Sequence, residues 1–164
     1  MSRRVLVLLA VPAVIALGGL AVLVVAVRTK SPRLLGAVRA VNKACWNPQA
    51  MKQAGRPGQS VSIVRHVGRT SGRAYETPVG AQPTGDGFVV ALTYGLQADW
   101  TKNVLAAGSA TIVHDGAEHP VVDPEVVPID RYLDAFSPSD QKGFRLFGIR
   151  ECLHLVIADA DSAA

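Results

Sequence analysis

Residues 60–80 read SVSIVRHVGRTSGRAYETPVG, two short strand-type runs on either side of a turn bounded by glycines. The first run, Ser60–Val67, is rich in β-branched residues, which favour strands. Gly68–Gly72 then provides the turn, and Tyr75–Ala81 forms the second run. A strand–turn–strand unit of this kind predicts a β-rich domain.

Short strands and turns alternate through the rest of the chain. One helix interrupts them, expected over Asp99–Ala107, with Asp99 as its N-cap and Gly108 just beyond its end. The dipeptide Asp115-Gly116 is typical of a hairpin turn. The other expected elements are strands at 88–94, 110–114, 118–127 and 152–157 and short helices at 128–136 and 139–147.

This order of elements predicts an α+β fold that is mainly β. Long helices do not alternate with the strands, as a Rossmann-type fold would require. Many short strands with one inserted helix instead indicate a small barrel or a strongly bent antiparallel sheet. We expect this domain at residues 59–158, followed by a short tail at residues 159–164.

An apolar block near the N-terminus predicts a membrane anchor. Val5–Val27 contains 23 residues without a charge, 20 of them apolar. As a helix it would be about 34 Å long, enough to cross the roughly 30 Å hydrocarbon core of a bilayer. A cleaved signal peptide is the alternative, but its apolar region is usually only about 7–15 residues long. We therefore expect one transmembrane helix within residues 1–30.

The cations that flank this block predict its orientation. Two arginines precede the block, whereas five basic residues follow it between residues 28 and 43. The positive-inside rule then predicts a single-pass protein of the cell membrane whose domain faces the cytoplasm. Residues 31–58 form a basic amphipathic juxtamembrane segment, because leucine and valine recur at helical spacing between residues 34 and 41. Its apolar stripe either lies on the lipid headgroups or packs on the domain.

The overall charge combines two opposed halves of the chain. The first 75 residues carry twelve Lys or Arg and no acid, whereas the remaining 89 carry five basic and thirteen acidic residues. The net charge of +4 therefore does not describe a uniformly basic protein. We expect no nucleic-acid partner.

Metal ligands and catalytic triads are not indicated. The four histidines are His66, His114, His119 and His154. None has a nearby Cys or His at the spacing of a zinc site, and no Gly-x-Ser-x-Gly motif is present. Cys45 and Cys152 do not form a disulfide framework, and we expect both to be small buried side chains.

The segment Gly68–Arg73 is a candidate anion-binding loop. Its two glycines allow backbone N–H groups to converge, and its hydroxyls and two arginines add donors and positive charge. It is not a Walker loop, because the spacing and the Lys-Ser/Thr ending are both absent. From these residues alone, a solvated hairpin turn explains the segment equally well.

The segment Thr93–Asn103 is a second candidate site. A strand is expected to end there in hydroxyl residues and a glycine, and a helix begins with Asp99, Trp100 and Asn103 in its first turns. Free N–H groups and a flat aromatic ring at a helix N-terminus can bind a polar planar ligand. The alternative is that Asp99 only caps the helix and Trp100 only anchors the core.

Taken in order, these motifs resemble one known family. The sequence Val67-Gly-Arg-Thr-Ser-Gly-Arg is followed by Thr77-Pro78, by Phe88–Gly95 and by Asp99-Trp100-x-x-Asn103-x-x-Ala106-x-Gly108. Over residues 34–157 this set resembles the deazaflavin-dependent nitroreductases, also called F420H2-dependent quinone reductases. The resemblance implies a split β-barrel of the FMN-binding split barrel type. It also implies the cofactor, coenzyme F420, a deazaflavin that carries a phosphate and an oligoglutamate tail.

The resemblance further implies which residues contact the cofactor. The glycine-bounded loop would hold the phosphate and tail, and the segment before the shared proline, the strand end and the helix start would supply the other contacts. The implied cofactor-binding residues are Arg69, Thr70, Ser71, Tyr75, Glu76, Thr77, Ala91, Leu92, Thr93, Tyr94, Asp99, Trp100, Thr101, Lys102 and Asn103. The resemblance implies no catalytic residue.

The combined hypothesis is a membrane-anchored oxidoreductase. Reduced coenzyme F420 would pass a hydride to an electron-poor acceptor such as a nitro compound or a quinone, with menaquinone as an acceptor that resides in the bilayer. Membrane lipid is a further expected partner, and family analogy allows a homodimer. One alternative is a non-catalytic split-barrel carrier of a deazaflavin, lipid-like or haem-like ligand. The other is a partner-binding module near the membrane.

Overall fold

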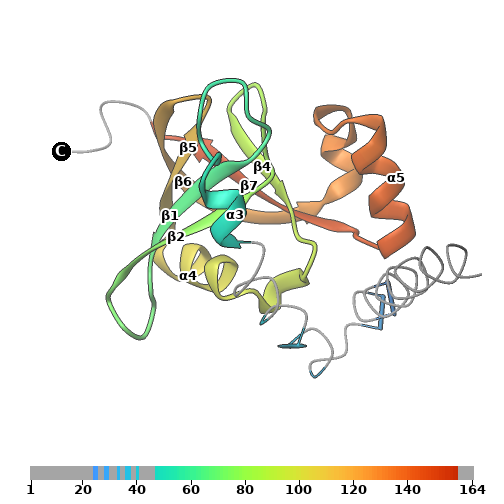
Figure 1. Cartoon of the computed structure of the whole chain (residues 1–164), viewed down its shortest axis with the longest axis horizontal. Helices are drawn as coiled ribbons and strands as arrows, with labels where there is room; N and C mark the ends of the chain where they lie inside the picture. The colour runs from blue at the N-terminus through green and yellow to red at the C-terminus, as the bar shows by residue number, and fades with distance from the viewer. Residues whose placement is uncertain are drawn as a thin grey trace, which may run out of the picture.

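One antiparallel sheet contains all strands of the described chain (Figure 1). The computed structural model describes residues 47–158 and single positions at 24, 25, 28, 29, 33, 36, 37 and 40. The strands are β1 (Ser62–Val67), β2 (Ala74–Val79), β3 (Ala81–Pro83), β4 (Gly87–Ala91), β5 (Ser109–His114), β6 (Ala117–Pro128) and β7 (Glu151–Ile157). The helical elements are α3 (Asn47–Met51), η2 (Gly95–Gln97), α4 (Asp99–Ala107), η3 (Ile129–Ala135) and α5 (Pro138–Phe147).

The sheet curls on itself because its two edge strands, β2 and β3, follow each other directly in the sequence. The strand order is β2-β1-β5-β6-β7-β4-β3, and every neighbouring pair is antiparallel. Strands β2 and β3 lie at opposite edges of the sheet, yet only Gly80 separates them in sequence. Since one residue spans less than about 4 Å, the two edges must approach each other. This curled sheet fits the expected split β-barrel (Figure 1).

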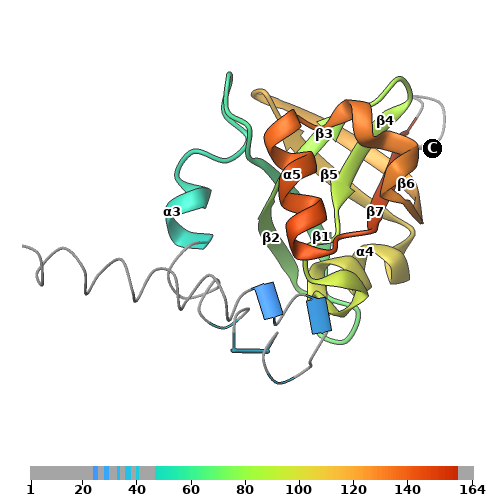
Figure 2. The same cartoon turned by 90° about the vertical axis from the view of Figure 1, so that its right-hand side faces the viewer.

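Alternating side chains fill the inside of the curled sheet and a second core on its outside. Phe88 and Val90 of β4 belong to the inner cluster, and Val89 between them belongs to the outer one. Phe136 and Phe144 complete the outer cluster, with ring centroids 4.9 Å apart and planes at 88°. Helices η3 and α5 therefore cover one outer face of the sheet (Figure 2).

The helix expected over Asp99–Ala107 is confirmed, with one correction at its start. It spans Asp99–Ala107, and Gly108 follows it in the left-handed region with φ of 71°. The expectation that Asp99 is the N-cap is wrong, because Ala98 occupies that position with φ of −65° and ψ of 135°. As the first helical residue, Asp99 still places a negative charge at the positive end of the helix dipole.

Two expected strands are interrupted before their predicted ends. The run 75–81 divides at Gly80, where the chain crosses from one sheet edge to the other. The run 88–94 ends its pairing at Ala91, and a turn then leads to Gly95, whose φ is 61°. Both interruptions border the pocket described below.

Several expectations fall on residues that the structure does not describe. These are most of the apolar run at 5–27, most of the amphipathic segment at 34–43, and the tail at 159–164. Pro48 lies in the first turn of α3, where proline is tolerated. Among the described residues, no helix combines the length and apolar character needed to cross a bilayer. The anchor and the domain bounds stay predictions.

Candidate functional site

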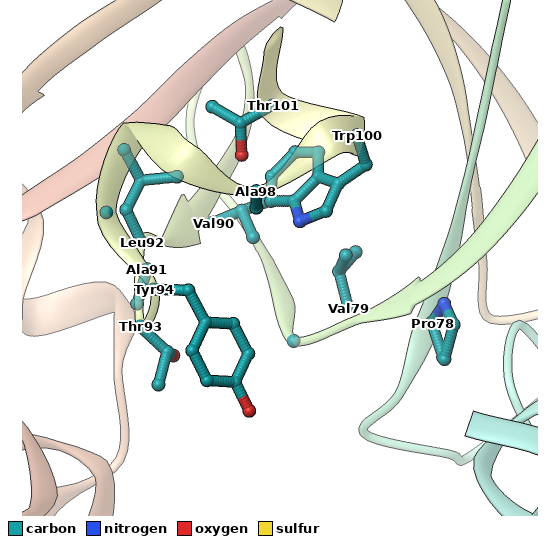
Figure 3. A pocket seen from close by; sticks show the side chains of 12 residues that line it. Pro78, Val79, Val90, Ala91, Leu92, Thr93, Tyr94, Ala98, Trp100 and Thr101 are labelled. Carbon is teal, nitrogen blue, oxygen red and sulfur yellow. The ribbon is translucent and has the colours of Figure 1, made fainter. Parts of the chain in front are cut away.

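A pocket opens between the end of β4 and the start of α4 (Figure 3). Its volume is about 160 Å³. The lining residues are Pro78–Gly80, Val90–Gly95, Ala98, Trp100 and Thr101. Figure 3 shows the Trp100 indole and the Tyr94 ring on two sides of the opening. The pocket therefore forms where the sheet edges meet and where β4 leaves the sheet.

The pocket combines apolar walls with a few hydroxyl groups. Val79 and Leu92 are buried parts of the inner core, whereas Thr93, Tyr94 and Thr101 contribute hydroxyls. Burial raises the pKa of the Tyr94 phenol above its ordinary value of 10.0, so the phenol is protonated at neutral pH. Apolar walls with a few polar groups are typical of small-molecule sites.

Thr101 places a buried hydroxyl at the pocket wall. The residue is fully buried, and its Oγ1 has no hydrogen-bond partner among the described residues. Buried hydroxyls are normally paired, because an unpaired one costs about 1–3 kcal/mol. Thr101 Oγ1 is therefore an unsatisfied polar atom next to the pocket.

The loop between β1 and β2 is a tight turn that needs its glycines. The Gly68 N–H donates to the Arg73 carbonyl at 2.8 Å, and the Gly72 N–H donates to the Gly68 carbonyl at 2.8 Å. Gly72 has φ of 65°, which favours glycine. A Cβ atom at Gly68 would collide with the Ser71 hydroxyl and the Tyr75 ring. The loop conformation therefore follows directly from the Gly-x-x-x-Gly spacing.

Asn103 of α4 holds this loop against the helix. Its Oδ1 accepts from the Arg69 backbone N–H at 3.2 Å and from the Arg69 guanidinium Nη1 at 2.9 Å. The same Nη1 lies 3.6 Å from Asp99 Oδ1. The loop arginine is thus fixed beside the helical turn whose Trp100 and Thr101 line the pocket.

His66 completes a buried hydrogen-bond chain behind Asn103. Asn103 Nδ2 lies 3.2 Å from His66 Nδ1. Because Asn103 Oδ1 already accepts hydrogen bonds from Arg69, the amide NH2 group must face the histidine. His66 Nδ1 is then the acceptor, and Nε2 carries the proton and donates to Thr77 Oγ1 at 3.2 Å. Burial lowers the pKa of His66, although the charge of Asp99 opposes the shift. Neutral His66 is the form that this chain requires.

The residues implied by the family resemblance divide into three groups. Six line the pocket: Ala91, Leu92, Thr93, Tyr94, Trp100 and Thr101. Seven belong to the glycine-bounded loop or to the polar contacts around it: Arg69, Thr70, Ser71, Tyr75, Thr77, Asp99 and Asn103. The loop and the helix start are thereby brought together, and their contact with a cofactor stays a prediction.

Two of the implied residues are engaged elsewhere. The Glu76 carboxylate accepts from Arg65 Nε at 2.8 Å and does not line the pocket. Lys102 Nζ donates to Gln97 Oε1 at 2.8 Å. Neither Glu76 nor Lys102 is among the residues that line the pocket.

His66 and the Pro78–Gly80 junction are absent from the residues implied by the resemblance. The local signal for His66 is its place directly before a polar loop, and its burial is known only from the structure, which buries Ser62, Val64 and His66 on one face of β1. A histidine on that face, directly before a polar loop, needs a hydrogen-bond partner. The junction carries no such signal, since its place in the pocket depends on the closure of the sheet.

Comparisons with known proteins give similarity of fold at low identity. No protein-family model matches the chain, and no curated protein matches it. The chain is similar to the solved structure of an F420-H2 dependent reductase, FDR-A, with 13% identity and a TM-score of 0.43, over 59% of this chain and 94% of that one. It is also similar to HutZ, a heme storage protein from Vibrio cholerae, with 13% identity and a TM-score of 0.46, over 69% of this chain and 90% of that one. Since these two proteins differ in what they bind, the functional argument rests on the residues of this chain.

Proposed function

We propose that this chain is a reductase that binds the reduced deazaflavin coenzyme F420 and passes a hydride to an electron-poor acceptor. One observation supports the proposal most directly: Asn103 holds Arg69 against the helix whose Trp100 and Thr101 line the pocket. A cationic loop and a pocket for a planar group are thereby parts of one site. The resemblance of the same motifs to the deazaflavin-dependent nitroreductases supports the same assignment.

The pocket residues fit one end of a deazaflavin ring. Sites that enclose whole drug-sized ligands measure roughly 300–1,000 Å³, so a pocket of about 160 Å³ takes only part of such a molecule. Trp100 offers an aromatic face, and Thr101 offers an unpaired hydroxyl. Arg69 and Arg73 of the loop would bind the phosphate and the anionic tail outside the pocket.

The chemistry divides between cofactor and protein. Reduced deazaflavin, when bound, supplies a hydride from its ring. The chain orients the reactants and excludes water, with Val79 and Leu92 as apolar walls. Reduction of a quinone to a hydroquinone needs one proton in addition to the hydride. Tyr94 is the candidate donor, because its phenol lines the pocket and burial keeps it protonated.

The proposed acceptor and location rest on the predicted membrane anchor. The anchor predicted within residues 1–30 would hold the domain at the cytoplasmic face of the cell membrane. A membrane-resident quinone such as menaquinone is then the acceptor at the highest local concentration. A nitro compound is the second acceptor class, and a homodimer stays a prediction from family analogy.

A non-catalytic carrier is the second candidate function. Its support is the apolar lining of the pocket, to which Pro78, Val79, Val90 and Leu92 contribute. Such walls also suit a deazaflavin held without turnover, or a lipid-like ligand. Cofactor binding without reduction of a menaquinone analogue would favour the carrier.

Arg69→Ala is expected to weaken the binding of coenzyme F420 by about 10- to 100-fold, the effect of losing a charge-assisted hydrogen bond. The loop itself is expected to persist, because the backbone N–H of residue 69 still donates to Asn103. Fluorescence titration of the purified chain with oxidised and reduced coenzyme F420 measures the effect.

Arg131→Ala is the matched control, since Arg131 is an exposed arginine on η3, outside the pocket and the loop. Its affinity for the cofactor should equal that of the wild type. Failure of the wild type to bind either form of the cofactor would exclude the proposed reductase. Equal affinity of the Arg69→Ala and wild-type chains would exclude the loop as the anion site.

Thr101→Val is expected to stabilise the ligand-free chain by about 1 kcal/mol and to weaken cofactor binding. Valine has nearly the same shape, and it removes a buried hydroxyl that has no partner among the described residues. Urea denaturation measures the first effect, and the same fluorescence titration measures the second. A residue with a purely structural role would show no loss of binding, so unchanged affinity would remove Thr101 from the site.

A further inference from the structure

A contact between Arg28 and α5 ties the N-terminal segment to the domain. Arg28 Nε donates to the Leu146 carbonyl at 2.8 Å, and Nη2 donates to the Arg145 carbonyl at 3.2 Å. The last carbonyls of a helix have no partner within the helix, and a cation there is favoured by the helix dipole. Arg28 therefore caps the C-terminal end of α5 from a position more than a hundred residues away in sequence.

The same end of α5 presents a basic face with one large apolar side chain. We call the exposed residues Lys142, Arg145, Leu146 and Arg150 the α5 basic face. Arg145 and Leu146 lie three and four positions after Lys142, so each is a neighbour of Lys142 on the helix surface. Leu146 is 49% exposed, and the helix's own carboxylate, Asp140, lies in its first turn. Cations around an exposed leucine are typical of surfaces that rest on anionic lipid headgroups.

The position of Arg28 in the sequence identifies the occupant of this face. Arg28 directly follows the 23-residue apolar run, at the point where the predicted anchor would leave the bilayer. We propose that the α5 basic face rests on the anionic cytoplasmic surface of the membrane and fixes the orientation of the barrel. This inference depends on the membrane location given under the proposed function, and not on the cofactor.

Docking of this face has a consequence for the pocket. Figures 1 and 2 both show α4 and the end of α5 that leads into β7 on the lower side of the domain. A bilayer on that side would bring the helix that lines the pocket close to the source of a membrane-resident acceptor. Docking of this face would therefore place α4, which lines the pocket, on the membrane side of the domain.

A spin label at residue 146 tests the proposal in the full chain. The Cys45→Ser, Leu146→Cys chain is reconstituted into vesicles of about seven parts phosphatidylcholine to three parts phosphatidylglycerol, and access of a water-soluble nickel chelate to the label is measured. The remaining Cys152 is fully buried, and burial raises its pKa to about 11, so it is expected to stay unlabelled. Gly85→Cys is the control, because Gly85 is exposed with nothing within 4 Å of an added Cβ.

We expect access at residue 146 to be about threefold lower than at residue 85 in these vesicles, and equal at both in pure phosphatidylcholine. Lys142→Gln with Arg145→Gln should remove the protection, because two cations change the docking equilibrium by about 30-fold. A chain that stays out of the vesicles overturns the anchor and the inference with it. A chain that inserts but shows equal access at both positions overturns the inference alone, as does protection that persists without the two cations.

Discussion

Gly87→Ala is expected to lower the free energy of unfolding by about 3 kcal/mol or more, the upper end of the cost of overpacking. Gly87 begins β4 and pairs with Val156 of β7. A Cβ atom there would lie 2.9 Å from Val156 Cα and closer still to the Leu155 carbonyl oxygen. These are backbone atoms of a paired strand, so the clash is relieved only if β4 and β7 separate. Urea denaturation followed by circular dichroism measures the loss.

Gly85→Ala provides the matched control for this prediction. Gly85 lies two residues away in the preceding turn, and an added Cβ there meets nothing within 4 Å. Its stability should stay within about 0.5 kcal/mol of the wild type. If both variants lose the same stability, the close approach of β4 and β7 is not the cause.

The composition of the strands explains why they were predictable. Ser60–Val67 is rich in β-branched residues, and that property is visible without a structure. The helix over Asp99–Ala107 was equally predictable, because Gly108 supplies the left-handed C-cap that ends it. Local chemistry determines these elements, so local sequence reveals them.

The closure of the sheet was not predictable in the same way. The run from Tyr75 to Ala81 looks like one strand, and only its pairing with β1 at one end and β4 at the other shows that it joins two edges. That pairing depends on residues far apart in the chain, so it cannot be predicted from the sequence of the run itself. The pocket walls at Pro78–Gly80 were missed for this reason.

The candidate site was predictable as two segments but not as a network. The loop at Gly68–Arg73 and the helix start at Asp99 each carried a chemical signal. Their connection through Asn103 depends on the packing of α4 near the end of β1. The same packing makes buried His66 part of the hydrogen-bond network behind the loop, a role that its position in the sequence did not indicate.

The charge state of His66 gives the wild type a defined dependence on pH. Burial holds the pKa of folded His66 below its ordinary value of 6.5, so protons favour the unfolded chain. The stabilisation from this group is complete above about pH 6.5 and is lost as the pH falls toward the folded pKa, by at most about 1.4 kcal/mol per pH unit. The Asn103 amide reinforces this state, because its NH2 group requires an unprotonated Nδ1.

Asn103→Asp is expected to reverse this behaviour. The substitution replaces the NH2 donor with a carboxylate oxygen 3.2 Å from His66 Nδ1, so a proton on that nitrogen becomes favourable. The pKa of folded His66 should rise above 6.5. The stabilisation from His66 should then be complete below the pKa of the unfolded chain and lost as the pH rises through the pKa of the folded chain.

Titration of the histidine C–H resonances by NMR measures the shift in the pKa of His66, with His66→Gln identifying the signal. A His66 resonance that titrates at the same pH in the wild type and in Asn103→Asp would show that the amide does not control this histidine. A raised pKa would instead establish that the side chain at position 103 acts directly on His66 Nδ1.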